Sequence, residues 1–209
     1  MQYQTEVMLD VVITFSQEQK VYLENKFVEM CEPARSDDRE AFDELCAKIP
    51  SFCEEIYQMG KDMVWPPLTP EDLKLFGGPQ TETPNDCVIC SVGSNIGCTL
   101  IPFFHRKYAA KSEALHKMVC DVIAEEKYDG GRHSFITFIW PKTKKTEGID
   151  ITRLFNENDV HTGINVVWAL LKFRDGRFVK EVRELQERLP KDIWIVHRKK
   201  IALYLERYG

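Results

Sequence analysis

A short apolar run that opens into two glycines is the sequence feature that most constrains the fold of this chain. Residues 88–92 are mostly apolar, and Gly93, Ser94, Asn95 and Gly97 follow directly. An apolar run of this length is typical of a buried strand. In an α/β protein, a glycine-bearing loop after such a strand lets a cofactor approach backbone N–H groups, because no Cβ stands in the way. We therefore expect this loop at the carboxyl edge of a sheet.

Strand and helix patterns alternate along the sequence. The predicted strands cover residues 5–15, 88–92, 133–140, 164–173 and 193–196, and a helix is an alternative for 164–173. A capping box at Ser16 and Gln19 predicts the start of a first helix, and a second is predicted through Phe42–Tyr57 with a break at Pro50. A further helix is predicted from Ser112 to a stop at Gly130 and Gly131. The remaining predicted helices cover residues 69–77, 151–155, 178–189 and 199–207. This alternation predicts an α/β fold with a mostly parallel sheet and helices on both faces.

The best internal boundary is a polar linker over residues 79–85, which is rich in threonine and proline. It separates an N-terminal strand and helical segment, residues 1–78, from an α/β region, residues 86–209. The chain of 209 residues is long enough for one generous domain.

Composition and charge exclude several classes of protein. Hydrophobic residues make up 44% and charged residues 29%, which is an ordinary globular mix. The net charge of −5 makes nucleic acid an unlikely partner. We expect no membrane span and, from the polar N-terminus, a cytoplasmic protein. The oligomeric state stays open.

Seven cysteines raise the question of a metal or redox site. They lie mostly in apolar patterns, and their number is odd. We expect reduced thiols and no bound metal, as is usual in the cytosol. The spacing of Cys87 and Cys90 fits a zinc half-site, with Cys98 and His105 after it, but residues three apart on a strand point to opposite faces.

The segment over residues 92–97, Val-Gly-Ser-Asn-Ile-Gly, resembles the V-G-A-N-I-G motif of FkbM-type S-adenosylmethionine-dependent methyltransferases. The stretches 65–68 and 76–78, which lead to Asp86 and Cys87, are similar to the nematode branch of that family. The resemblance implies a Rossmann-like fold for residues 86–209. It also implies that S-adenosylmethionine is the cofactor and that Gly93, Ser94, Asn95 and Gly97 bind it.

A second family motif, K-I-D-x-E-G, has a counterpart at residues 172–176. The resemblance implies catalytic roles for Lys172 and Asp175, although Arg174 stands where the family has an acid. His161, just before a predicted strand, is a candidate general base at the sheet edge. The predicted reaction is methyl transfer to an oxygen or nitrogen nucleophile of a small-molecule or protein acceptor, with donor and acceptor held in line.

Two alternatives from other classes remain. The sequence has no clear acid for the cofactor ribose after the second strand, which favours a non-catalytic interaction protein with a degraded methyltransferase-like sheet. In addition, residues 127–132 match K-x-D-G-x-R, the motif of nucleotidyl-lysine transferases such as DNA ligases and capping enzymes, with Lys127 as nucleophile. The helical pattern before Lys127 speaks against this third hypothesis.

Overall fold

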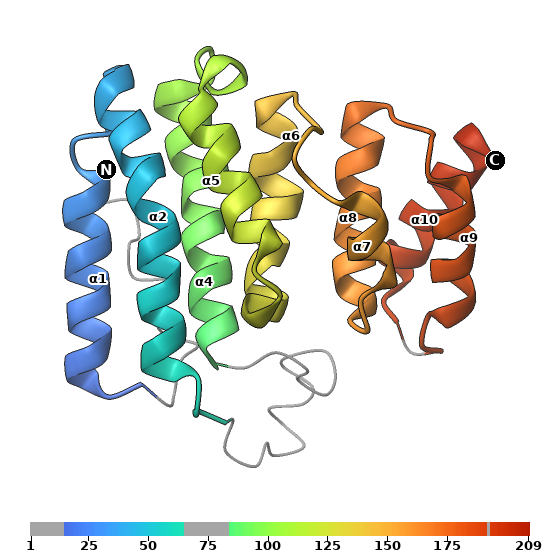
Figure 1. Ribbon diagram of the computed structural model, residues 1–209, viewed down its shortest axis with the longest axis horizontal. Helices are drawn as coiled ribbons and strands as arrows, with labels where there is room; N and C mark the ends of the chain where they lie inside the picture. The colour runs from blue at the N-terminus through green and yellow to red at the C-terminus, as the bar shows by residue number, and fades with distance from the viewer. Residues whose placement is uncertain (1–14, 65–83, 192) are drawn as a thin grey trace.

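The chain folds into helices wherever its structure is described. The structure is a computed structural model that describes residues 15–64, 84–191 and 193–209. Within these ranges every regular element is a helix, and there is no strand. The helices stand side by side in a row that begins with α1 and ends with α9 and α10 (Figure 1).

The row contains α-helices with short 3-10 and π-helical segments between them. The α-helices are α1 (Gln17–Cys31), α2 (Arg39–Gly60), α4 (Pro84–Asn95), α5 (Glu113–Ala124), α6 (Trp140–Thr143), α7 (Ile151–Asn156), α8 (Val160–Phe173), α9 (Val179–Arg188) and α10 (Ile195–Tyr208). Two segments are π-helical, η2 (Ile96–His105) and η5 (Phe135–Ile139), and two are 3-10 helices, η3 (Ala109–Lys111) and η4 (Glu126–Arg132).

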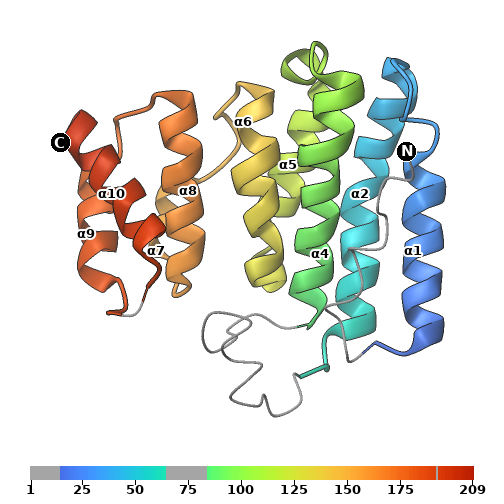
Figure 2. The same ribbon diagram turned by 180° about the vertical axis from the view of Figure 1, so that it is seen from behind.

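The helices form two layers. Helices α2, α5, α7 and α9 lie on the side that faces the viewer in Figure 1, whereas α4, α6, α8 and α10 face the viewer in Figure 2. Contacts run along each layer and between them: α2 packs against α4 and α5, and α8 packs against η5, α7, α9 and α10. Each helix pair thus covers the apolar side of the preceding pair, which is the stacking principle of α-solenoids.

The helix over Asn85–His105, formed by α4 and η2, lies at the centre of the N-terminal half. This helix is long and apolar enough to cross a membrane, but the core helix of a globular protein can meet the same two criteria. Here Val88, Ile89, Val92 and Ile96 are fully buried against neighbouring helices. These contacts explain its apolar character, and the expectation of no membrane span stays a prediction.

Several helix predictions are confirmed, above all where a capping side chain marks the start. The Ser16 side chain accepts a hydrogen bond from the Gln19 backbone and completes a capping box. The Ser112 side chain caps α5 by accepting a hydrogen bond from the Leu115 backbone. The predicted break at Pro50 is wrong, because α2 continues through it. The stop at Gly130 and Gly131 is also misplaced, because α5 ends at Ala124.

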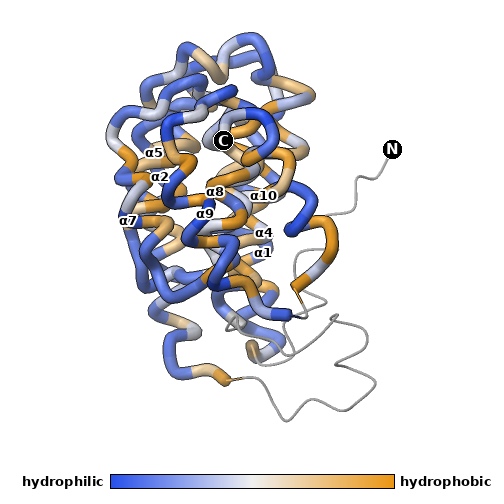
Figure 3. The backbone as a smooth tube through the Cα atoms, turned by 90° about the vertical axis from the view of Figure 1, so that its right-hand side faces the viewer, coloured by the Kyte–Doolittle hydropathy of each residue, from blue (hydrophilic) through white to orange (hydrophobic). Residues whose placement is uncertain are grey.

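The predicted Rossmann-like α/β fold with a mostly parallel sheet is wrong. Residues 88–92 lie in α4, and 133–140 form a helical stretch that includes η5. For residues 164–173, in α8, the helix alternative is correct, and 193–196 lead into α10. The helix α8 contacts η5, α7, α9 and α10, so it is packed on several sides, and Figure 3 shows hydrophobic and hydrophilic stretches side by side in the helices at this end of the row. In α4, Val88, Ile89, Val92 and Ile96 are buried at helical spacing, but five residues are too few to show that period, so a short apolar run resembles a buried strand.

Some predictions concern residues outside the described ranges. The strand over 5–15 lies almost wholly there, and the helix at 69–77 lies there entirely. The linker over 79–85 is described only in its last two residues, which begin α4. Because α2 packs against α4 and α5, the two sides of the predicted boundary share one core. The boundary itself stays a prediction.

Candidate functional site

Most of one layer of the structure is built from stretches of sequence that contain no carboxylate. These stretches are residues 87–112, 130–146, 160–174 and 193–205. They supply η2, η5 with α6, α8, and most of α10. We call the outward side of η5, α6, α8 and the middle of α10 the acid-free face, because these segments carry no carboxylate of their own; at its margins Asp159 lies beside His133 and Glu113 pairs with Lys145. Because the whole chain carries a net charge of −5, the carboxylates must be concentrated elsewhere.

Three lysines of this face come from three neighbouring helices: Lys142 of α6, Lys172 of α8 and Lys200 of α10. The Lys172 ammonium donates a hydrogen bond to the backbone oxygen of Thr137 at 2.7 Å and lies 5.8 Å from the centre of the Phe138 ring. The Lys200 ammonium lies 4.5 Å from the centre of the Trp168 ring. Two of the three cations are therefore held against aromatic rings.

The three lysines act on one another electrostatically. Burial lowers the pKa of Lys172, and the positive charges of Lys142 and Lys200 lower it further, while Cys98 has the opposite effect. Over the described ranges, the lysines that pair with carboxylates are others: Lys26, Lys48, Lys117, Lys127, Lys145 and Lys180. We call Lys142, Lys172 and Lys200 the lysine cluster, and its positive charge is not neutralised by any described side chain.

A polar stripe along α8 connects the lysine cluster to a group of histidines. His161, Asn165, Trp168 and Lys172 recur at helical spacing and are all at least partly exposed. Asn165 accepts a hydrogen bond from the Thr137 hydroxyl at 2.6 Å, and its amide donates to the backbone oxygen of His161 at 2.8 Å. These bonds hold the stripe in place.

At the other end of the stripe, the ring of His161 lies between those of His133 and His197, with centroids 6.3 and 5.9 Å away. Burial lowers the pKa of His197, and the charges of His161 and His133 add to this effect. His133 Nε2 lies 2.9 Å from a carboxylate oxygen of Asp159. Burial alone would raise the pKa of Asp159, but hydrogen bonds from His133, Thr162 and a backbone N–H outweigh it and hold that pKa well below its usual range.

Metal-binding geometry is not found here. In the described part of the chain, no three His, Cys, Asp or Glu side chains are arranged to hold a metal ion. All seven cysteines are free thiols, and Cys90 Sγ lies 2.9 Å from the Ser134 hydroxyl. Burial raises the pKa of the Cys31 thiol to about 12, which makes it chemically inert.

The residues predicted to bind S-adenosylmethionine belong to helices, so the predicted glycine loop is wrong. A Cβ on Gly93 would lie 2.8 Å from the Phe135 ring, and one on Gly97 would lie 2.7 Å from Cβ of Phe138. The two glycines thus allow η5 to pack closely on the α4–η2 helix. Ser94 shares a hydrogen bond of 2.7 Å with the Ser134 hydroxyl, so it too contributes to this contact.

The side chain of the fourth predicted cofactor residue, Asn95, makes no capping hydrogen bond to η2. Its amide instead donates a hydrogen bond to the backbone oxygen of Ser91, one turn earlier in the same helix, at 3.0 Å. The loop that would bring backbone N–H groups to the cofactor is therefore replaced by helix. Binding of S-adenosylmethionine itself stays a prediction.

The predicted catalytic residues do not form one constellation. His161 and Lys172 lie on the same stripe, but eleven residues of helix separate them by about 16 Å. Asp175 follows α8 and forms an ion pair of 2.6 Å with Arg177, whose hydrogen bonds hold the Asp175 pKa below its usual range. The predicted strand before the second motif is instead α8, which ends at a left-handed Arg174.

The motif over residues 127–132 is explained by packing. Lys127 pairs with Glu54 at 2.7 Å and Glu125 at 3.4 Å, and these contacts raise its pKa. A nucleophilic lysine needs the opposite shift. Arg132 is buried and paired with Glu157, so it is not available to a nucleotide.

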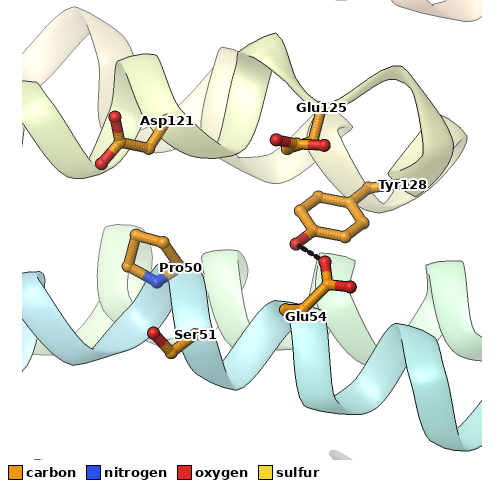
Figure 4. A pocket seen from close by; sticks show the side chains of 6 residues that line it. All are labelled: Pro50, Ser51, Glu54, Asp121, Glu125 and Tyr128. Atoms are coloured by element: carbon orange, nitrogen blue, oxygen red, sulfur yellow. Dashed lines mark hydrogen bonds between the residues drawn. The ribbon is translucent and has the colours of Figure 1, made fainter.

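An open hollow of about 320 Å³ lies between α2 and the segment formed by α5 and η4 (Figure 4). Its lining residues are Pro50, Ser51, Glu54, Asp121, Glu125 and Tyr128. The carboxylates already have partners: the Tyr128 hydroxyl donates to Glu54 at 2.9 Å, and Lys117 pairs with Asp121 at 2.6 Å. The hydrogen bond from Lys127 is the main reason that the pKa of Glu54 falls to about 2. We assign no ligand to this hollow.

Comparisons with known proteins identify no relative. No protein-family model, no curated protein and no solved structure matches the chain. The candidate site therefore depends on its own geometry. Sequence reasoning singled out His161 and Lys172 as site residues. It placed Lys142 and Lys200 in two separate basic groups, with solvated surface as the main interpretation and an acidic or phosphorylated partner as the alternative. It missed Trp168 and the proximity of the three lysines, although the four long stretches without a carboxylate are visible in the sequence.

Proposed function

We propose that this protein is a non-catalytic interaction protein whose acid-free face binds an acidic segment of a partner protein. The observation that carries the proposal is the lysine cluster: three cations from three helices with no carboxylate partner among the described side chains. Mutually repelling charges lower stability, and a bound anion would relieve this repulsion. The row of helices provides a rigid surface on which such a segment can lie.

Exposed apolar side chains favour a protein segment over a nucleic acid as the occupant. Phe138 beside Lys172 is 36% exposed, and Trp194 and Ile195 at the start of α10 are 56% and 70% exposed. Aromatic side chains next to cations are typical of the sites that dominate protein–protein binding. A long polyanion such as a nucleic acid would also be repelled by the negative charge elsewhere on the protein, whose net charge is −5.

The histidine group supports binding better than catalysis. His133 and Asp159 resemble the base and orienting acid of a hydrolase, and the Thr162 hydroxyl lies 3.4 Å from His133 Nε2. Thr162, however, is fully buried and donates its proton to Asp159 at 2.8 Å. A nucleophile in that position is closed to substrate, and the group instead fixes the start of α8.

A fluorescent peptide of alternating glutamate and leucine tests the proposal by anisotropy. We expect saturable binding that weakens with salt, and at least about a tenfold loss of affinity in Lys142→Glu and in Lys200→Glu. Lys180→Glu is the matched control, because Lys180 is an exposed lysine of α9 in the other layer and the change in net charge is the same. Equal losses in all three variants, or no binding to the wild type, would contradict the proposal.

A further inference from the structure

The lysine cluster is centred on Lys172. Lys142, Lys172 and Lys200 come from α6, α8 and α10, which follow one another across the layer (Figure 2). The charges of the two outer lysines both act on Lys172 in the middle. The contacts agree with this order: Phe138, whose ring lies beside the Lys172 ammonium, is four residues before Lys142, and Trp168, whose ring lies beside the Lys200 ammonium, is four residues before Lys172. An anion bound at Lys172 is therefore attracted by two further cations, which favours an anion of high charge.

Two of the three ammonium groups are positioned before any ligand binds. The hydrogen bond to Thr137 orients Lys172, and the ring of Trp168 supports Lys200. A pre-positioned side chain loses less conformational freedom on binding. These contacts use aromatic rings and a backbone oxygen, so the positive charge stays available to a ligand.

From this geometry we infer that the lysine cluster binds the phosphoryl group of a phosphorylated side chain on the partner segment. This inference rests on the proposed function. A phosphoryl group carries a charge of about −1.5 to −2 at neutral pH and three acceptor oxygens, so one bound at Lys172 is strongly attracted by the two outer lysines as well. A carboxylate carries a charge of about −1 and two oxygens, so it balances less of the positive charge of the cluster. The exposed ring of Phe138, next to Lys172, is placed to contact an apolar side chain beside the phosphorylated residue.

Three versions of one labelled peptide test the inference. They carry phosphoserine, glutamate or serine at a single position in the same acidic and apolar sequence. We expect the phosphoserine peptide to bind about tenfold more tightly than the glutamate peptide, and the glutamate peptide to bind more tightly than the serine peptide. Inorganic phosphate should compete only at concentrations far above that of the phosphopeptide, because it lacks the flanking contacts.

Variants of the cluster separate its role from general electrostatics. Lys142→Gln, at an exposed position, should abolish most of the advantage of the phosphopeptide, and Lys172→Arg should retain it. Lys180→Gln on α9 is the control that should change nothing. Circular dichroism and thermal melting of each variant establish that it is folded.

The outcomes distinguish the inference from the proposed function. Equal binding of the phosphoserine and glutamate peptides would overturn the phosphoryl site and leave the acidic-segment proposal intact. If none of the peptides binds, both fail. Binding to phosphatidylcholine vesicles that contain phosphatidylserine, without binding to any peptide, would also overturn both and would assign the face to membranes.

Discussion

Arg132 is buried and donates hydrogen bonds to both carboxylate oxygens of Glu157, with nitrogen–oxygen distances of 3.0 and 2.6 Å. Its remaining donors reach the backbone oxygens of Asp129 and Ile123 at 3.1 and 3.3 Å. One side chain thus ties the end of α5 and the 3-10 segment η4 to the residue that follows α7. Arg132 is the arginine of the K-x-D-G-x-R motif, which predicted a contact with a nucleotide. In the structure its role is to form this bidentate ion pair.

Removal of Glu157 should therefore destabilise the fold. We expect Glu157→Gln to lower the free energy of unfolding by about 3 kcal/mol, because it leaves a buried guanidinium without its counter-ion. Urea denaturation measures the change. Glu32→Gln, which disrupts the exposed pair with Arg35, is the control and should cost less than about 1 kcal/mol. Similar costs for the two variants would show that the buried pair is not stabilising.

A side chain at Gly93 should weaken the packing between α4 and η5. Gly93→Val places atoms within 3 Å of the Phe135 ring, and we expect it to lower the free energy of unfolding by about 1–3 kcal/mol or to prevent folding. Ala47→Val, at an exposed position of α2, is the matched control. A fully stable Gly93→Val protein that had lost heat of binding to S-adenosylmethionine in calorimetry would instead support the cofactor role that the sequence resemblance implied.

The stability of the protein should fall in acid. The pKa of Glu54 is about 2, and that of Asp159 is also held below its usual value. A carboxyl group with a lowered folded-state pKa stabilises the fold above its unfolded pKa, about 4, and loses this contribution as the pH falls through the folded value. We expect the free energy of unfolding to decrease from about pH 5 down to about pH 2.

Asp159→Asn isolates one part of this dependence. Asparagine keeps a cap for the backbone N–H groups of His161 and Thr162 but loses the charge beside His133. Urea denaturation at several pH values should therefore show lower stability at neutral pH and a shallower acid dependence than in the wild type. An unchanged pH profile would contradict the role of this carboxylate.

Lys127 should form no covalent adduct with a nucleotide. Its ammonium is paired with Glu54 and Glu125, which raise its pKa and keep it protonated. Incubation with radiolabelled ATP or GTP and Mg²⁺, followed by denaturing electrophoresis, should give no labelled band. A band that is present in the wild type and absent from Lys127→Ala would revive the nucleotidyl-transfer hypothesis.

The sequence predicts helices best where local chemistry marks their ends. Ser16 with Gln19, and Ser112, are such marks, and the helices after them are found as expected. Residues 88–92 and 133–140 have no such mark. Val88, Ile89, Val92 and Ile96 are buried at helical spacing, but this pattern is visible only over more than the five residues of the predicted strand. In 133–140 nearly every residue is at least partly buried, and the π-helical turns of η5 further shift the spacing away from 3.6.

The candidate site is only partly visible in the sequence. Lys172 was singled out by a family motif, yet its partners in the cluster lie thirty residues before it and twenty-eight after it in the chain. Only the packing of α6, α8 and α10 in one layer brings Lys142 and Lys200 near it. The four stretches without a carboxylate can be recognised in the sequence, but the packing that brings the three lysines close together cannot.

The uneven placement of charge also gives the described helices an electric dipole. Helix α2, near one end of the row, carries five carboxylates against two cations, whereas α10, at the other end and in the other layer, carries four cations against one carboxylate. An approaching anionic partner would experience a torque that turns the cationic end toward it before contact, even though the whole protein is an anion. The encounter would thus be pre-oriented at a distance, and electrolyte would slow association more than the small net charge implies.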